Sequence, residues 1–166
     1  MNNTKLLLIL GTAACITCGC AKTTAFGDEA LLSKQEDFVN LLNVKNVPLQ
    51  ERHYGAYVFS DMGAWSSYAL PENEGYEYCG SFIGPMVMTG RGWIAATLAQ
   101  PIIKVNEREF DLVRNIQTAK YLPGKLIQEF NNKDIHFTTE LCFATNRTAV
   151  VRSVIKNVSG QPMPVS

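Results

Sequence analysis

The sequence has no excess of charge of either sign, because 15 basic residues balance 15 acidic ones over 166 residues, and no run of five like charges occurs. Nucleic-acid-binding domains normally carry a basic surplus, and disordered chains are poor in apolar residues. In this chain, 46% of the residues are hydrophobic. These features exclude a nucleic-acid partner and a disordered tail, and the length predicts one folded domain.

The sequence also lacks the short motifs of common catalytic and metal sites. Its two histidines, His53 and His136, are far apart, and neither lies in a zinc-ligand spacing. No Gly-x-Ser-x-Gly nucleophile elbow and no Gly-x-x-x-x-Gly-Lys phosphate loop occurs. We therefore expect no metal, no cofactor and two surface histidines.

The first twenty residues have the pattern of an export signal. Lys5 precedes an apolar run over 6–16 that is too short for a transmembrane helix. Gly19-Cys20 resembles the end of a bacterial lipobox and makes Cys20 the expected lipidation site, although Thr17 stands where an aliphatic residue is usual. Cleavage by ordinary signal peptidase near 23–25 is the alternative. We expect an exported protein, periplasmic or in the cell envelope, that meets the membrane only through a lipid anchor.

Few cysteines remain beyond this signal. Cys79 and Cys142 are the only two. In an oxidising compartment they are able to form one disulfide. The alternative is two separate buried thiols, because free cysteine packs as a small apolar residue.

By sequence the chain divides into a signal peptide at 1–20, a tether, helix and connector at 21–52, and a β-domain at 53–166. An amphipathic helix is predicted over 28–44, because Leu31, Phe38 and Leu41 recur at helical spacing. The connector, at 45–52, contains the dipeptide Val-Pro.

From residue 54 onward the pattern changes to β-strands joined by turns. Strands are predicted at 54–59, 82–89 with an interruption at its Gly-Pro, 93–98, 102–105, 124–130, 135–143 and 149–158. Asn106-Glu107 is predicted to be a hairpin turn. Over 135–143, apolar and polar residues alternate, which gives a strand one dry face and one wet face. Serial hairpins of this kind predict a mainly β fold, an antiparallel β-sandwich.

The last four residues, 163–166, resemble the beginning of a further strand. A sandwich that lacks its last strands leaves an unpaired edge. We therefore interpret the sandwich as incomplete and the chain as the first part of a longer protein.

Residues 59–93 combine aromatics, glycines and prolines with few charges. Trp65, Tyr68 and Trp93 are candidates for stacking on sugars, because a pyranose presents an apolar C–H face to a flat aromatic ring. The alternative for the tryptophans is the sandwich core. Asp61 is the candidate carboxylate, and its alternative role is to form a turn. These four residues are candidates for carbohydrate binding or for a domain interface.

Several blocks of the sequence resemble the N-terminal domain of bacterial glucosidases of glycoside hydrolase family sixty-three. The blocks are Phe59-Ser60-Asp61-Met62-Gly63-Ala64-Trp65, Tyr68-Ala69-Leu70-Pro71, Gly80-Ser81-Phe82-Ile83-Gly84-Pro85, Tyr121-Leu122-Pro123-Gly124 and 144–152. The resemblance runs from about residue 41 to the end. It implies an exported inverting α-glucosidase for gluco-oligosaccharides, with an N-terminal β super-sandwich and a following (α/α)₆ barrel that holds the catalytic acid and base.

No segment of this sequence corresponds to that barrel, so no catalytic residue is carried over. We expect a scaffold whose partners are the catalytic barrel and, through the complete enzyme, a gluco-oligosaccharide. The alternatives are a lipid-anchored carbohydrate-binding module and a structural envelope lipoprotein. The low-charge stretches 61–68 and 80–88 are the expected rim that packs on the barrel.

Overall fold

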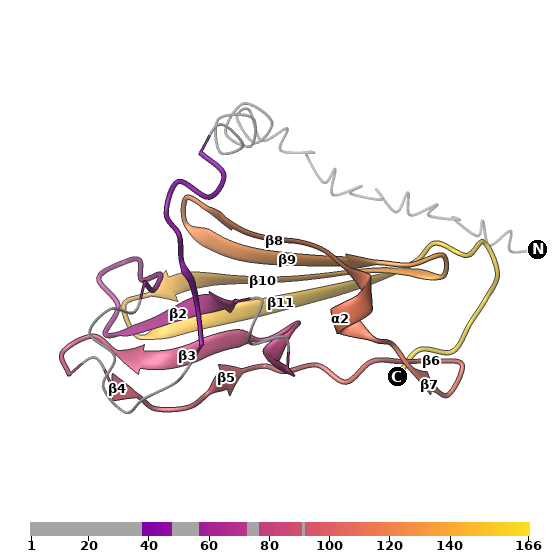
Figure 1. Ribbon diagram of the computed structural model, residues 1–166, viewed down its shortest axis with the longest axis horizontal. Coiled ribbons are helices and arrows are strands. Elements are labelled where there is room, and N and C mark those ends of the chain that lie inside the picture. Colours follow the sequence, from indigo (N-terminus) through magenta and orange to yellow (C-terminus); the bar gives the residue numbers. More distant parts are fainter. Residues whose placement is uncertain (1–37, 48–56, 73–76, 91) are drawn as a thin grey trace, which may run out of the picture.

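The computed structural model describes residues 38–47, 57–72, 77–90 and 92–166 (Figure 1). This part of the chain is mainly β, as predicted, and its strands form sheets of five, four and two strands. Its one helix is the single turn α2 (Leu112–Asn115). None of these residues belongs to a helix long and apolar enough to cross a membrane.

The five-stranded sheet is irregular and made of short strands. It contains β1 (Lys45–Asn46), β2 (Ser66–Pro71), β3 (Phe82–Val87), β4 (Gly92–Trp93) and β5 (Thr97–Leu98). Strand β3 lies antiparallel to β2, β4 and β5. Strand β1 lies parallel to β2, so the connector predicted from residue 45 onward begins instead with a strand.

The four-stranded sheet is a regular meander in which spatial order follows chain order. It contains β8 (Ile116–Leu122), β9 (Lys125–Asn131), β10 (Ile135–Thr145) and β11 (Thr148–Asn157). Strands β9, β10 and β11 confirm the strands predicted for this region. Strand β8 was not predicted, because its side chains are mostly half-buried and show no clear apolar alternation.

The two larger sheets pack against each other through a shared apolar core. Near one end, the Phe143 ring of β10 lies 5.5 Å from that of Phe59 and 5.8 Å from that of Tyr68, between ring centroids. A second cluster contains the stacked rings of Phe130 and Phe137, whose centroids are 5.5 Å apart. Burial alternates along β10 as the sequence predicted, so this strand forms one wall of the core.

A buried glutamine adds a polar link between the sheets. Gln128 of β9 has no exposed surface. Its Oε1 accepts a hydrogen bond from the Gly80 backbone N–H at 3.1 Å, and its Nε2 donates to the Ser81 carbonyl at 2.7 Å. Gly80 has φ +86, and a Cβ there would lie 2.8 Å from a Leu112 methyl group. Glycine therefore allows the chain to enter β3 close to both β9 and α2.

Strand β3 continues through Gly84-Pro85, but its pairing with β2 shifts register there, between Ser67–Met86 and Ala69–Ile83, so the predicted interruption is present as an irregularity of the ladder. Gly84 has φ +121, and a Cβ there would lie only 2.9 Å from the Ser67 carbonyl oxygen of β2. The absence of a side chain lets the two strands approach closely at this point.

The helix predicted over 28–44 is wrong in its described part, and residues 28–37 lie outside the described residues. Residues 38–42 form a turn and a bend, with Asn40 at φ +53. The Asn40 backbone N–H donates to the Tyr121 carbonyl, and its Oδ1 accepts from the Tyr121 N–H, both at 2.9 Å. These bonds to the edge of β8 override the local helical periodicity.

Strands β6 (Lys104–Val105) and β7 (Arg108–Glu109) form a small hairpin. Its turn is Asn106-Glu107, as predicted, and both residues have positive φ. The Ser166 backbone exchanges two hydrogen bonds with Lys104, of 2.7 and 3.0 Å. The strand predicted to begin at 163 is therefore present as a single bridge to β6, and these residues do not form the expected open edge.

Candidate functional site

Three segments meet at one end of the sandwich, on the left in Figure 1, and we call this surface the loop end. It is formed by residues 57–65, by residues 88–90 and 92–94 around β4, and by the β10–β11 turn at Asn146-Arg147. Exposed apolar side chains gather on it: Tyr57, Met62, Trp65, Met88 and Ile94. Apolar side chains gathered on a surface mark sites where partners or ligands bind.

Trp65 is a surface residue, because 64% of it is exposed, and the core alternative for this tryptophan is wrong. Its backbone carbonyl accepts a hydrogen bond from the Met88 N–H at 3.0 Å, which ties the segment before β2 to the end of β3. The backbone of Trp65 is therefore tied to the end of β3, and its indole lies at the surface.

Asp61 forms the turn that precedes Trp65. Its Oδ1 accepts from the Met62 N–H at 2.7 Å, and its carbonyl accepts from the Ala64 N–H at 2.9 Å. Met62 and Gly63 both have positive φ, as the two central residues of a type I′ turn do. The carboxylate thus has the structural role that the sequence offered as the alternative to a site role.

Tyr68 cannot stack on a sugar in this structure, and the prediction for this residue is wrong. It is only 6% exposed, because the pleat of β2 turns its ring inward onto Phe143. Trp93 on β4 pairs with Met86 and is half-buried. Its indole nitrogen is buried and has no hydrogen-bond partner within the described part of the chain.

The predicted rim is only partly at the surface. Ser67, Phe82, Ile83 and Met86 are buried in the strands β2 and β3. In the described structure, the exposed part of the rim lies in the loop residues at its ends, such as Trp65 and Met88. Strand β2 is covered on both faces, since five consecutive residues of it are buried, and aromatic and small residues also serve as packed core.

A cavity of about 440 Å³ lies beside Trp65. Its described lining contains Trp65, Ser66, Val87, Ile94, Asn146 and Arg147. The first four come from the five-stranded sheet and its loops, whereas the last two form the turn between β10 and β11. Sequence analysis missed the last two, because a turn motif gives no sign of what it faces across the sandwich. Among the described lining residues there is no carboxylate, and hence no pair of carboxylates for acid–base chemistry.

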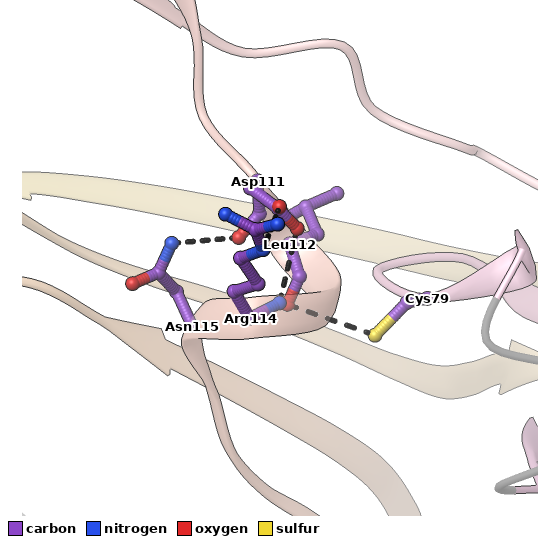
Figure 2. Close-up of polar contacts among 5 residues, drawn as sticks. All are labelled: Cys79, Asp111, Leu112, Arg114 and Asn115. Carbon is purple, nitrogen blue, oxygen red and sulfur yellow. Dashed lines mark hydrogen bonds and ion pairs between the residues drawn. The ribbon is translucent and has the colours of Figure 1, made fainter.

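A second cavity, of about 710 Å³, lies beside α2 and includes Glu77, Glu109 and Asp111 in its lining. Figure 2 shows how Asp111 is engaged: Oδ1 accepts from the Arg114 N–H at 3.0 Å, and Oδ2 lies 3.2 Å from Arg114 Nε. The Asp111 carbonyl also accepts from Asn115 Nδ2 at 2.7 Å. This carboxylate therefore caps the helix turn and is not a free general base.

Cys79 lies at the wall of the second cavity, and its thiol donates to the Leu112 carbonyl at 3.9 Å (Figure 2). Burial is the main reason that the pKa of this thiol is raised to about 11. The thiol is protonated near neutral pH and is a poor nucleophile. Cys142 lies half-buried on the wet face of β10, as does His136, and both cysteines are free in the structure.

The family model described as "Glucosidase YgjK, N-terminal" matches residues 45–166. The match begins at β1 and includes every strand described above, both cavities and the loop end. The chain belongs to the family of N-terminal domains of glucosidase YgjK.

Proposed function

We propose that this chain is the scaffold domain of an exported glycoside hydrolase of family sixty-three, and that a separate (α/α)₆ barrel performs the hydrolysis of gluco-oligosaccharides. The observation that carries the proposal is the family match over residues 45–166. The blocks of sequence that resemble this enzyme family lie in the same range.

The contacts of the described residues support a non-catalytic role. Glycoside hydrolysis normally requires two carboxylates that flank the scissile bond. Asp61 stabilises a turn, Asp111 caps a helix, and the cavity beside Trp65 has no carboxylate in its lining. We therefore assign the acid and the base to the catalytic barrel.

We further propose that the loop end faces that barrel and forms part of the rim of the substrate entrance. Its exposed side chains, Tyr57, Met62, Trp65 and Met88, support this assignment, because interface cores are rich in aromatic residues and methionine.

Enzyme assays test whether hydrolysis is performed by the catalytic barrel and not by this chain. The chain alone is assayed on a panel of α- and β-glucosides, and we expect no turnover. Addition of the catalytic barrel of a family-sixty-three glucosidase is expected to give a complex that elutes as one species and is more active than the barrel alone. Turnover by the purified chain that is lost in Asp61→Asn but kept in Asp111→Asn would contradict the proposal. A chain that binds oligosaccharide but never associates with the barrel is a free-standing carbohydrate-binding module.

We propose envelope anchoring through Cys20, on the basis of the signal pattern alone. Each buried CH₂ of an acyl chain contributes roughly 0.8 kcal/mol, and stable anchoring needs more than one chain. Cys20→Ala is expected to move the protein from the membrane fraction to the soluble fraction. An unchanged fraction, with mature protein that starts near Phe26, rules out the lipid anchor.

A further inference from the structure

We propose that the cavity between Trp65 and the turn Asn146-Arg147 is a binding subsite for a hexose unit of a neutral oligosaccharide. The assignment of that unit as glucose rests on the proposed function, whereas the assignment of a sugar rests on the geometry of the cavity itself.

The apolar side of the cavity contains an exposed aromatic side chain. Trp65 is 64% exposed, and its backbone is tied to Met88 by a hydrogen bond and follows the turn that Asp61 stabilises. Ile94, also largely exposed, and Val87 complete this side. A flat indole beside aliphatic side chains matches the apolar C–H face of a pyranose ring.

The turn on the opposite side of the cavity supplies polar groups that are free to bind a ligand. Within the described residues, the Arg147 guanidinium has no ion pair and the Asn146 side chain makes no hydrogen bond. The Ser66 hydroxyl, beside Trp65, makes none either. An amide offers both donors and an acceptor, and a guanidinium offers a planar set of five donors. Neighbouring hydroxyls of a sugar are matched partners for such groups.

The hairpin holds this polar side in a defined position. Thr145 and Thr148 pair across the turn, and the Arg147 backbone N–H donates to Thr145 Oγ1 at 3.1 Å. The turn is therefore ordered before any ligand arrives, which lowers the entropic cost of binding. The volume of about 440 Å³ lies within the usual range of small-ligand sites, roughly 300–1,000 Å³.

The charge of the lining favours a neutral ligand. Arg147 is the only charged residue among the described lining residues, and it is exposed at a hairpin turn. Salt and solvent screen a single exposed charge, so it gives little preference for an anion. Stacking and hydroxyl contacts are left as the main contributions to affinity.

Maltotriose is the probe that tests the subsite, titrated into the full chain by calorimetry and by intrinsic tryptophan fluorescence. We expect saturable binding that is weakened at least about tenfold by Trp65→Ala and about three- to tenfold by Arg147→Ala. Trp65→Phe is expected to retain part of the affinity, because it keeps an aromatic face. The matched controls are Arg108→Ala, in the β6–β7 hairpin, and Ile102→Ala, an exposed apolar residue outside the cavity lining; neither is expected to change binding.

Failure of the subsite and failure of the proposed function are distinguishable. Absence of saturable binding, or binding unchanged in Trp65→Ala with normal circular dichroism, overturns the subsite even if the chain still associates with the catalytic barrel. Loss of barrel association in Trp65→Ala without any change in maltotriose binding also overturns it, and makes Trp65 an interface residue. Trp65-dependent binding by a chain that never associates with the barrel supports the subsite and contradicts the proposed scaffold role.

Discussion

The four-stranded sheet and the five-stranded sheet of this domain obtain their order from different sources. Strands β9, β10 and β11 are long and follow one another along the chain, and β10 alternates buried with half-buried side chains over most of its length. Strands β1, β4 and β5 have two residues each, too few to show a period-two pattern, and their positions are set by pairing with β2 and β3. The four-stranded sheet is thus specified largely by local sequence pattern, whereas the five-stranded sheet depends more on packing against the four-stranded one. The candidate subsite forms where loops of the irregular sheet meet a turn of the regular one.

The largest expected loss of stability comes from a core substitution, which also tests whether the two sheets unfold as one unit. Phe130→Ala removes a fully buried ring from β9 and is expected to lower the free energy of unfolding by about 3–5 kcal/mol. Because both sheets share a core, urea unfolding followed by circular dichroism and by tryptophan fluorescence should show one coincident transition. Val150→Ala, at an exposed position on β11, is the control with little expected loss. Separate transitions for the two signals would show that the regular sheet is stable alone.

The next effect concerns the polar link between the sheets. Gln128→Leu leaves the Gly80 N–H and the Ser81 carbonyl buried without their partner, at a cost of about 1–3 kcal/mol for each group. Denaturant unfolding at fixed pH measures this loss. A stability equal to that of the wild type would mean that water replaces both bonds.

The variant Gln128→Glu tests the same polar link through the pH dependence of its stability. Only the protonated acid is able to donate to the Ser81 carbonyl, and burial raises the carboxyl pKa in the folded state. The stability of this variant is therefore highest below the unfolded pKa of about 4.3 and falls as pH rises through the folded pKa. A pH profile identical to that of Gln128→Leu would show that the carboxyl group escapes to solvent.

The smallest effect on stability is expected at the loop end. Trp65→Ser changes an exposed side chain and should alter the free energy of unfolding by no more than about 0.5 kcal/mol. Self-association of the isolated chain, followed by light scattering, should decrease because an exposed apolar patch is reduced. A soluble monomer that is several kcal/mol less stable would place Trp65 in the core.

Three of the four strands of the regular sheet were predictable because their signals are local. Alternation located β10, whose buried polar residue Thr139 accepts a hydrogen bond at Oγ1 from Ser153 Oγ at 3.3 Å. The irregular parts were less predictable. The end of the predicted helix fails because Asn40 bonds to Tyr121, a partner 81 positions away.

The candidate site could be predicted only in part for the same reason. Aromatic composition identified Trp65, but it also selected Tyr68, which the pleat of β2 turns into the core. Asn146 and Arg147 were missed, because their position beside Trp65 follows from the packing of the two sheets. Residue type indicates what a side chain is able to bind, whereas the fold decides whether it reaches the surface.

The buried glutamine of β9 also constrains strand register. A slip of one residue turns Gln128 outward and brings the neighbouring Glu129 into the apolar core. A slip of two residues keeps Gln128 facing inward but moves it by roughly 7 Å, out of reach of Gly80 and Ser81. Apolar neighbours such as Leu126 and Phe130 tolerate such shifts far better, because apolar contacts have no required direction. Gln128 therefore allows the sandwich to discriminate between the native alignment of its sheets and alignments that bury a similar apolar area.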